Sequence, residues 1–161
     1  MIEKGRGPIL RVENLTKRFG GLTALLDVSF ELNEGEAIGI IGPNGSGKTT
    51  LALHLVGILR PTNRDAKISV AGLDISTEPL HRIIQHINYV FQNPYNQLFN
   101  ETFEEEVAYG PTQLKLDEEE IERRVTHSLE AVGLLELRNF YQASLTRSEA
   151  TLLGLASVLS M

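Results

Sequence analysis

Cysteine and tryptophan are missing from this chain of 161 residues. The absence of cysteine excludes disulfide bonds, thiolate catalysis and cysteine-ligated zinc sites, and it suits a reducing compartment. Long hydrophobic runs are missing too, because the most apolar windows, "LALHLVGIL" and "TLLGLASVLSM", reach only about half of the ~20 residues that span a bilayer. The first ten residues lack the apolar centre of a secretory signal. We therefore expect a soluble, cytoplasmic protein.

Positive charge is scarce as well. The chain has 15 lysine and arginine residues against 21 aspartate and glutamate residues, which gives a net charge of -6 and an isoelectric point of about 5.2. Proteins that bind a nucleic-acid backbone concentrate lysine and arginine, so we expect no nucleic-acid partner. Any anionic ligand must be bound by a local group of residues. Hydrophobic content of 42% and charged content of 22% are ordinary for a globular protein.

Two kinds of pattern predict strands. Alternation of apolar and polar residues in "ILRVENL" and "VSFEL" predicts two half-buried strands in an antiparallel region, with Gly20 and Gly21 in the turn that precedes the second. The continuous apolar run "AIGIIG" predicts a strand that is covered on both faces, as in a parallel sheet. The predicted strands are residues 9–15, 28–32, 37–42, 66–72 and 87–92.

Helices are predicted between and after these strands. Residues 49–59 form one, with Pro61 as its stop signal, and residues 78–87 contain a short one. Thr102 and Glu105 have capping-box spacing, and the dipeptide Gly110-Pro111 is expected to end that helix. Asp117 and Glu120 repeat the starting signal, and Gly133 the stop. The apolar face of this last helix is Ile121, Val125, Leu129 and Val132.

Glycines and a lysine gather in "IGIIGPNGSGKTTL", residues 38–51. Gly42, Gly47, Lys48 and Thr49 match the phosphate-binding pattern G-x-x-x-x-G-K-[ST] between a predicted strand and a predicted helix. Glycines allow backbone N–H groups to surround a phosphate, and the following helix adds its positive end. Lys48 suits the β- and γ-phosphates, Thr49 suits Mg²⁺, and Thr50 suits phosphate. The nucleotide-binding residues that we expect are Asn44, Gly45, Ser46, Gly47, Lys48, Thr49 and Thr50.

The stretch "LTKRFGGLTALLDVSFELNEGEAIGIIGPNGSGKTTL" resembles the start of an ABC transporter ATPase. The resemblance implies an α/β P-loop NTPase fold. In that fold a mostly parallel sheet is joined by an N-terminal antiparallel β subdomain and a helical subdomain. It also implies ATP as the nucleotide, and stacking of Phe19 on the adenine. Without the family, a core position would be the favoured interpretation of Phe19.

A second stretch, "YVFQNPYNQLFNETFEEEVAYGP", resembles the Q-loop region of the same family. The resemblance implies that Gln92 reaches Mg²⁺ or the attacking water, and that its loop contacts a membrane subunit. The positions Asn93, Pro94, Gln97, Leu98 and Phe99 look like those of cobalt, nickel and energy-coupling-factor vitamin importers. For Gln97, an exposed loop amide without such a role remains open.

The family signature LSGGQ is altered in this chain, which has "LTRSEATLLGLASVLSM" in its place. Leu145 matches, and Thr146 can still cap the helix with its hydroxyl group. Arg147 and Ser148 replace two glycines, and Glu149 replaces the glutamine. In the family this segment closes over the γ-phosphate bound to the opposite subunit. A carboxylate there would meet like charge, partly offset by Arg147, so we expect impaired activity.

The resemblance also implies that three functional residues lie beyond Met161: the Walker B aspartate, the catalytic glutamate and the switch histidine. We therefore expect a truncated ATP-binding domain over residues 1–161, with apolar sheet edges exposed and marginal stability. Its expected parts are residues 1–60, 61–100 and 101–161. The four histidines, His54, His81, His86 and His127, lack the spacing of metal ligands or catalytic bases, and we expect surface or packing roles.

The leading hypothesis is an ABC-type ATPase subunit that binds ATP with Mg²⁺ and couples hydrolysis to import of cobalt, nickel or a vitamin. By resemblance its partners are a second ATPase subunit and an integral membrane subunit at the inner face of the cell membrane. The alternatives are a non-hydrolysing subunit that lends only its phosphate-binding loop, a truncated relic, and a P-loop kinase. The kinase would not explain the positions of Phe19 and Gln92.

Overall fold

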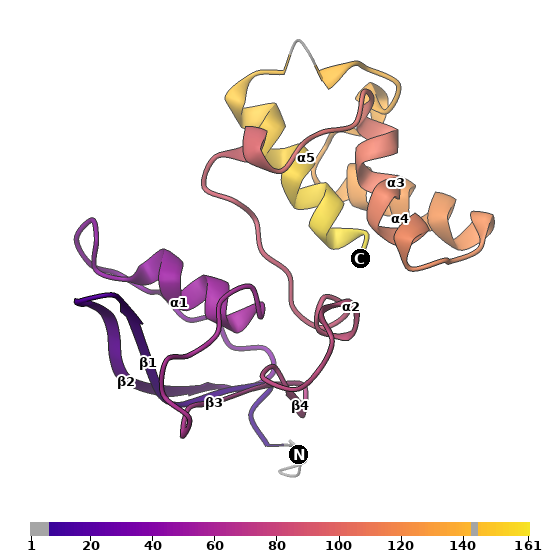
Figure 1. Cartoon of the computed structure of the whole chain (residues 1–161). Coiled ribbons are helices and arrows are strands. Elements are labelled where there is room, and N and C mark those ends of the chain that lie inside the picture. The colour runs from indigo at the N-terminus through magenta and orange to yellow at the C-terminus, as the bar shows by residue number, and fades with distance from the viewer. Residues whose placement is uncertain (1–6, 143–144) are drawn as a thin grey trace. The chain divides into compact units, whose positions relative to one another are not determined.

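The structure is a computed structural model that describes residues 7–142 and 145–161. The chain forms two compact units, one ending at Asn88 and the other beginning at Tyr89 (Figure 1). Part of the expectation on the first ten residues concerns residues 1–6, which lie outside the described ranges. Across the described residues, every helix is too short or too polar to cross a bilayer.

The first unit is built on a four-stranded sheet with the order β2-β1-β3-β4, and each pairing is antiparallel. The predicted N-terminal hairpin is confirmed, with its turn at Gly20 and Gly21, and so is the predicted strand within residues 66–72. The strands are β1 (Leu10–Phe19), β2 (Leu22–Leu32), β3 (Lys67–Val70) and β4 (Leu73–Asp74).

The core of this unit lies on one face of the sheet. Alternating residues of β1, Leu10 and Val12, are buried there together with Ile68 of β3. Two helices contribute to the same cluster: α1 (Lys48–Leu55) supplies Leu51, and α2 (Leu80–Ile83) supplies Ile83. Because Leu51 belongs to the helix that follows the glycine loop, this cluster attaches the loop to the sheet.

Two of the predicted strands are not formed. Residues 37–42 have no regular structure, and the exposed fractions of Ile38, Ile40 and Ile41 are 49%, 42% and 96%. Residues 87–92 have no regular structure either. A strand needs a neighbour that takes up its backbone hydrogen bonds, and no described strand pairs with either segment. Apolar residues are exposed beside the loop, as expected.

Helix α1 ends earlier than predicted, at Leu55 rather than at residue 59. Gly57 adopts a φ of 75°, the left-handed conformation that ends helices. The Ile58 N–H then donates to the Leu53 carbonyl at 3.0 Å and closes the end of the helix. The stop is therefore Gly57, and Pro61 lies beyond it.

The second unit is helical. Its core joins Phe103 and Val107 with Leu129 and Leu153, which come from three different helices. The predicted apolar face of the middle helix is confirmed, because Val125 and Leu129 are buried and Ile121 and Val132 pack against them. The elements are α3 (Phe103–Gln113), α4 (Glu118–Ala131), α5 (Arg147–Leu159) and the short 3-10 helices η1 (Pro94–Asn96) and η2 (Leu135–Leu137).

The predicted helix starts are confirmed, and one predicted stop is wrong. Thr102 and Glu105 form the capping box of α3, and Asp117 accepts a hydrogen bond from the Glu120 N–H at 2.9 Å. Helix α3 continues through Pro111, although proline cannot donate to the carbonyl four residues earlier. The Ser160 hydroxyl donates to that carbonyl, Val107 O, at 2.8 Å, so the helix continues with its acceptor satisfied.

Candidate nucleotide-binding site

The glycine loop packs directly against strand β2 through Gly47. Gly47 has a φ of 91°, and a Cβ at this position would lie 2.5 Å from the Ala24 carbonyl oxygen and 3.0 Å from Leu25 Cδ2. Both the backbone conformation and the close approach therefore require glycine. This contact holds the start of α1 beside β2.

The start of α1 offers unpaired donors. Gly47 is the N-cap residue and gives no side-chain cap, and its carbonyl accepts from the Leu51 N–H at 2.8 Å. In the described part of the chain, the N–H groups of residues 48–50 make no backbone hydrogen bond. No acidic side chain stands in the first turn of the helix. The positive end of the helix is therefore open to an anion.

Lys48 places its ammonium group inside the loop. Its Nζ donates to the carbonyl oxygens of Gly42 and Pro43, both at 2.8 Å, and lies 3.4 Å from Ser46 Oγ. Thr49, the next residue, is exposed in the first turn. The donor set of N–H groups, one ammonium and one free hydroxyl fits a nucleotide phosphate with Mg²⁺, with Thr49 as the one ligand that the loop supplies.

Phe19 lies at the same end of the β1–β2 hairpin as the loop. In the hairpin register Arg18 pairs with Thr23, next to Ala24, the residue that Gly47 contacts. The Phe19 side chain is 48% exposed, so the alternative of a core position is wrong. Lys17 Nζ lies 5.2 Å from the Phe19 ring centroid. Sequence reasoning missed Lys17, although its position two residues before Phe19 puts both side chains on one face of the strand.

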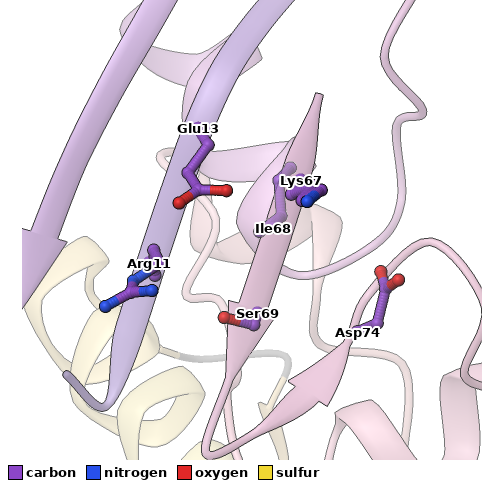
Figure 2. Close-up of a pocket in the computed structure, with 6 residues that line it drawn as sticks. All are labelled: Arg11, Glu13, Lys67, Ile68, Ser69 and Asp74. Atoms are coloured by element: carbon purple, nitrogen blue, oxygen red, sulfur yellow. The ribbon is translucent and has the colours of Figure 1, made fainter. Parts of the chain in front are cut away.

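A separate cavity of about 350 Å³ lies on the sheet, between side chains of β1, β3 and β4 (Figure 2). Its charges balance, and Arg11 is already paired with Glu31 at 2.8 Å. A polyanion therefore finds a better site at the glycine loop than here. The lining residues are Arg11, Glu13, Lys67, Ile68, Ser69 and Asp74.

In the second unit, the two glutamines of the Q-loop region differ in their surroundings. The Gln92 side chain is exposed. Gln97 is half-buried, its Oε1 accepts from the Phe91 N–H at 3.3 Å, and its Nε2 donates to the Gly154 carbonyl at 2.8 Å. Gln97 is therefore not the exposed loop amide that the sequence left open.

The signature-like residues form the start of α5. Thr146 Oγ1 accepts from the Glu149 N–H at 3.3 Å, and Glu149 Oε2 accepts from the Thr146 N–H at 2.8 Å and from its hydroxyl at 2.7 Å. The expected hydroxyl cap is confirmed. These hydrogen bonds, first that of the Thr146 side chain, hold the pKa of Glu149 below its usual value. Among the described ion pairs there is none between Arg147 and Glu149.

The histidines are placed as expected for surface and packing residues. His54 is fully buried in α1, with Nδ1 2.7 Å from the Thr50 carbonyl oxygen. His81, His86 and His127 are exposed. Within residues 7–142 and 145–161, no three histidine, aspartate or glutamate side chains come together as metal ligands.

The fold and the loop together define a P-loop nucleotide-binding protein. The family model described as ABC transporter matches residues 25–161, and the chain belongs to this family. It is 40% identical over 159 residues to a "Putative ABC transporter ATP-binding protein" of Methanosarcina mazei, which covers 99% of this chain and 32% of that protein. It is 42% identical over 141 residues to the "Energy-coupling factor transporter ATP-binding protein EcfA" of Methanothermobacter thermautotrophicus, over 88% of this chain and 45% of that protein.

A solved structure is similar as well. The structure of cbiO1 from Clostridium perfringens, described as part of the ABC transporter complex cbiONQ, superposes with a TM-score of 0.84 at 31% identity. The match covers 96% of this chain and 62% of that one. These matches confirm the family resemblance and the P-loop NTPase fold class. The chain spans about a third to about a half of these two curated relatives' lengths.

Proposed function

We propose that this chain binds Mg-ATP at residues 42–50, as the ATP-binding part of an ABC transporter ATPase. One observation carries the proposal: the contact of Gly47 with Ala24 holds a helix start with unpaired N–H groups and the Lys48 ammonium in one loop. The family match supports ATP as the nucleotide.

The residues of the loop have separate tasks in binding. The N–H groups of residues 45–50 donate to the β-phosphate, and Lys48 moves its ammonium from the loop carbonyls to the β- and γ-phosphates. Thr49 and Gln92 would supply protein ligands for Mg²⁺, which would neutralise phosphate charge when it is bound. Phe19 stacks on the adenine with one face of its ring, while the Lys17 ammonium contacts the other face of the Phe19 ring.

At the level of the whole protein, we propose that ATP hydrolysis drives import of cobalt, nickel or a vitamin. The similarity to EcfA and to cbiO1 supports this class of importer. The partners would be a second ATPase subunit and an integral membrane subunit, with this chain peripheral on the cytoplasmic face of the membrane.

The second candidate is a subunit that binds ATP without hydrolysing it. The Thr146–Glu149 capping box favours it, because a carboxylate occupies the donors at the start of α5 where the family signature meets a phosphate. This subunit would pair with a complete ATPase. The test mixes this chain with the complete ATPase and measures phosphate release. Release from one active site per pair, with no release from this chain alone, would favour the second candidate over the first.

Calorimetric titration of Mg-ATP tests the loop assignment. Lys48→Ala should weaken binding by at least about 100-fold, because a charge-assisted contact to phosphate is lost. Lys67→Ala removes the same charge from an exposed position on β3 and should bind like the unchanged chain. Equal affinity in both variants would refute the assignment.

A further inference from the structure

Strand β1 loses its regular pairing with β2 before it reaches Phe19. The register shifts between Val12 and Leu15, and again on each side of Lys17. Asn14 lies in the first of these irregularities and has a φ of 54°, a left-handed conformation that asparagine tolerates. Bulges bend a strand and redirect its side chains. Pairing with β2 therefore does not by itself fix the strand end that carries Phe19.

Beyond its pairing with β3, strand β1 is held by residues 60–63, here called the 60–63 segment. The Thr62 N–H donates to the Thr16 carbonyl at 2.9 Å. The Thr62 hydroxyl oxygen accepts from the Arg18 N–H, also at 2.9 Å. Because Arg18 directly precedes Phe19, this second hydrogen bond restrains the backbone that carries the ring.

Asn63 adds two hydrogen bonds of the kind that a neighbouring strand would make. Its Oδ1 accepts from the Thr16 N–H at 3.0 Å, and its Nδ2 donates to the Asn14 carbonyl at 2.6 Å. One side-chain amide thus supplies an acceptor and a donor, as a backbone peptide group does in a sheet. The 60–63 segment therefore takes the place of a neighbouring strand beside the irregular part of β1.

The same segment also fixes the side chain next to the ring. Lys17 Nζ donates to the Arg60 carbonyl at 2.7 Å and lies 5.2 Å from the Phe19 ring centroid. The ammonium group is thus held between the 60–63 segment and the ring. Thr62 restrains the backbone before Phe19, and Arg60 restrains the ring through Lys17.

We infer that the 60–63 segment positions Phe19 for base stacking, with Thr62 as the main positioning residue. The segment follows α1, the helix that starts at the glycine loop, and so connects the phosphate-binding part of the site to the base-stacking part. Without this restraint the ring has more freedom to lose when it stacks, which weakens binding. The inference rests on the proposed function for its nucleotide step, whereas the hydrogen bonds are independent of nucleotide.

The first test needs no ligand. Amide hydrogen exchange in the full chain, followed by NMR, should show the Arg18 amide exchanging at least about fivefold faster in Thr62→Val, because valine has a similar shape and no acceptor. Thr77→Val makes the same change at an exposed position after β4 and should leave the exchange of Arg18 unchanged. Equal Arg18 exchange in the two variants would overturn the inference.

The second test separates the base from the phosphates. Calorimetric titration compares Mg-ATP with Mg-tripolyphosphate, which has the phosphate chain and no base. Thr62→Val should weaken binding of Mg-ATP at least about threefold and change binding of tripolyphosphate less than about 1.5-fold, because only the base stacks on Phe19. Thr77→Val should bind both ligands like the unchanged chain. An equal loss for both ligands, or no loss for Mg-ATP, would contradict the inference.

A double-mutant cycle tests whether Thr62 acts through Phe19. In the Phe19→Ala background no ring is left to position, so Thr62→Val should weaken Mg-ATP binding less than about 1.5-fold there. A general disturbance of the glycine loop would persist in this background. The same loss with and without Phe19 would therefore overturn the positioning role.

The outcomes also separate this inference from the proposed function. If neither ligand binds the unchanged chain, the loop assignment fails and the nucleotide step fails with it, while the exchange of Arg18 still decides whether the 60–63 segment holds β1. If Mg-ATP binds no tighter than tripolyphosphate, stacking on Phe19 fails and the loop assignment stands. Should Thr62→Val not fold, Asn63→Asp, which removes the donor Nδ2, replaces it in both tests, with a smaller effect in the same direction.

Discussion

The Ser160 hydroxyl donates a 2.8 Å hydrogen bond to the carbonyl oxygen of Val107, the group that Pro111 leaves without a helical donor. Ser160 is fully buried. Ser160→Ala should lower the free energy of unfolding by about 1–2 kcal/mol, because the carbonyl then loses its partner away from water. Urea unfolding measures the change. In a Pro111→Ala background the helix can supply the missing donor, so the same substitution should cost less there; an equal cost in both backgrounds would contradict this role.

Glu106 is a buried carboxylate that anchors the residues following the Q-loop segment. Its Oε2 accepts from the backbone N–H groups of Phe99 and Asn100 at 3.0 and 2.9 Å, and from the side-chain amides of Asn100 and Gln142. Glu106→Leu should lower the free energy of unfolding by about 3 kcal/mol, because several donors lose their acceptor. Glu106→Gln keeps one oxygen and should lose less. Thermal unfolding of the two variants compares them; equal losses would show that the hydrogen bonds are not the cause.

Glu120, in helix α4, makes the stability of the folded chain depend on pH. The Arg123 and Arg124 side chains hydrogen-bond its carboxylate and lower its pKa from 4.5 to about 2. A lowered pKa in the folded chain means that the stabilisation is complete above about pH 4.5 and is lost as the pH falls toward about 2. Glu120→Gln should therefore reduce the loss of stability across this range. Urea unfolding at several pH values measures it, with Glu118→Gln in the same helix turn as the control. The same acid dependence in both variants would contradict the assignment.

Thr146 caps α5, and its removal should be measurable. Thr146→Ala should lower the free energy of unfolding by about 1 kcal/mol, because the Glu149 N–H and the Glu149 carboxylate both lose their partner in the hydroxyl group. Glu149→Gln keeps the reciprocal bond to the Thr146 N–H and should change stability less. Circular dichroism during urea unfolding compares both variants. A larger loss for Glu149→Gln would show that the charge, and not the cap, stabilises the helix start.

The sequence predicted the parts of the fold that depend on local interactions. The capping box at Thr102, the side-chain cap at Asp117 and the turn at Gly20 need only neighbouring residues, and all three were placed correctly. The strand predicted at residues 37–42 depends on a partner strand elsewhere in the chain, and the described residues do not pair with it. Likewise, the stop predicted at Pro111 failed because Ser160, far away in sequence, satisfies Val107.

The candidate site was predictable to a similar extent. The spacing of Gly47 and Lys48 is a local pattern, and it identified the loop from sequence alone. The contact of Gly47 with Ala24 and the position of Lys17 over Phe19 depend on how the hairpin folds, and only the structure shows them. The connection of Gln97 to Gly154 is longer still in sequence, and no local pattern indicates it.

The measurement that tests the account most directly is a two-dimensional amide NMR titration of the full chain with Mg-ATP. We expect the backbone N–H signals of residues 45–50 to shift together along one saturation curve, because these groups donate to the phosphates. Signals of Arg11 and Ser69, in the separate cavity on the sheet, should stay in place. Unchanged signals of residues 45–50 at saturating nucleotide, or shifts confined to that cavity, would contradict the proposal that this loop binds Mg-ATP.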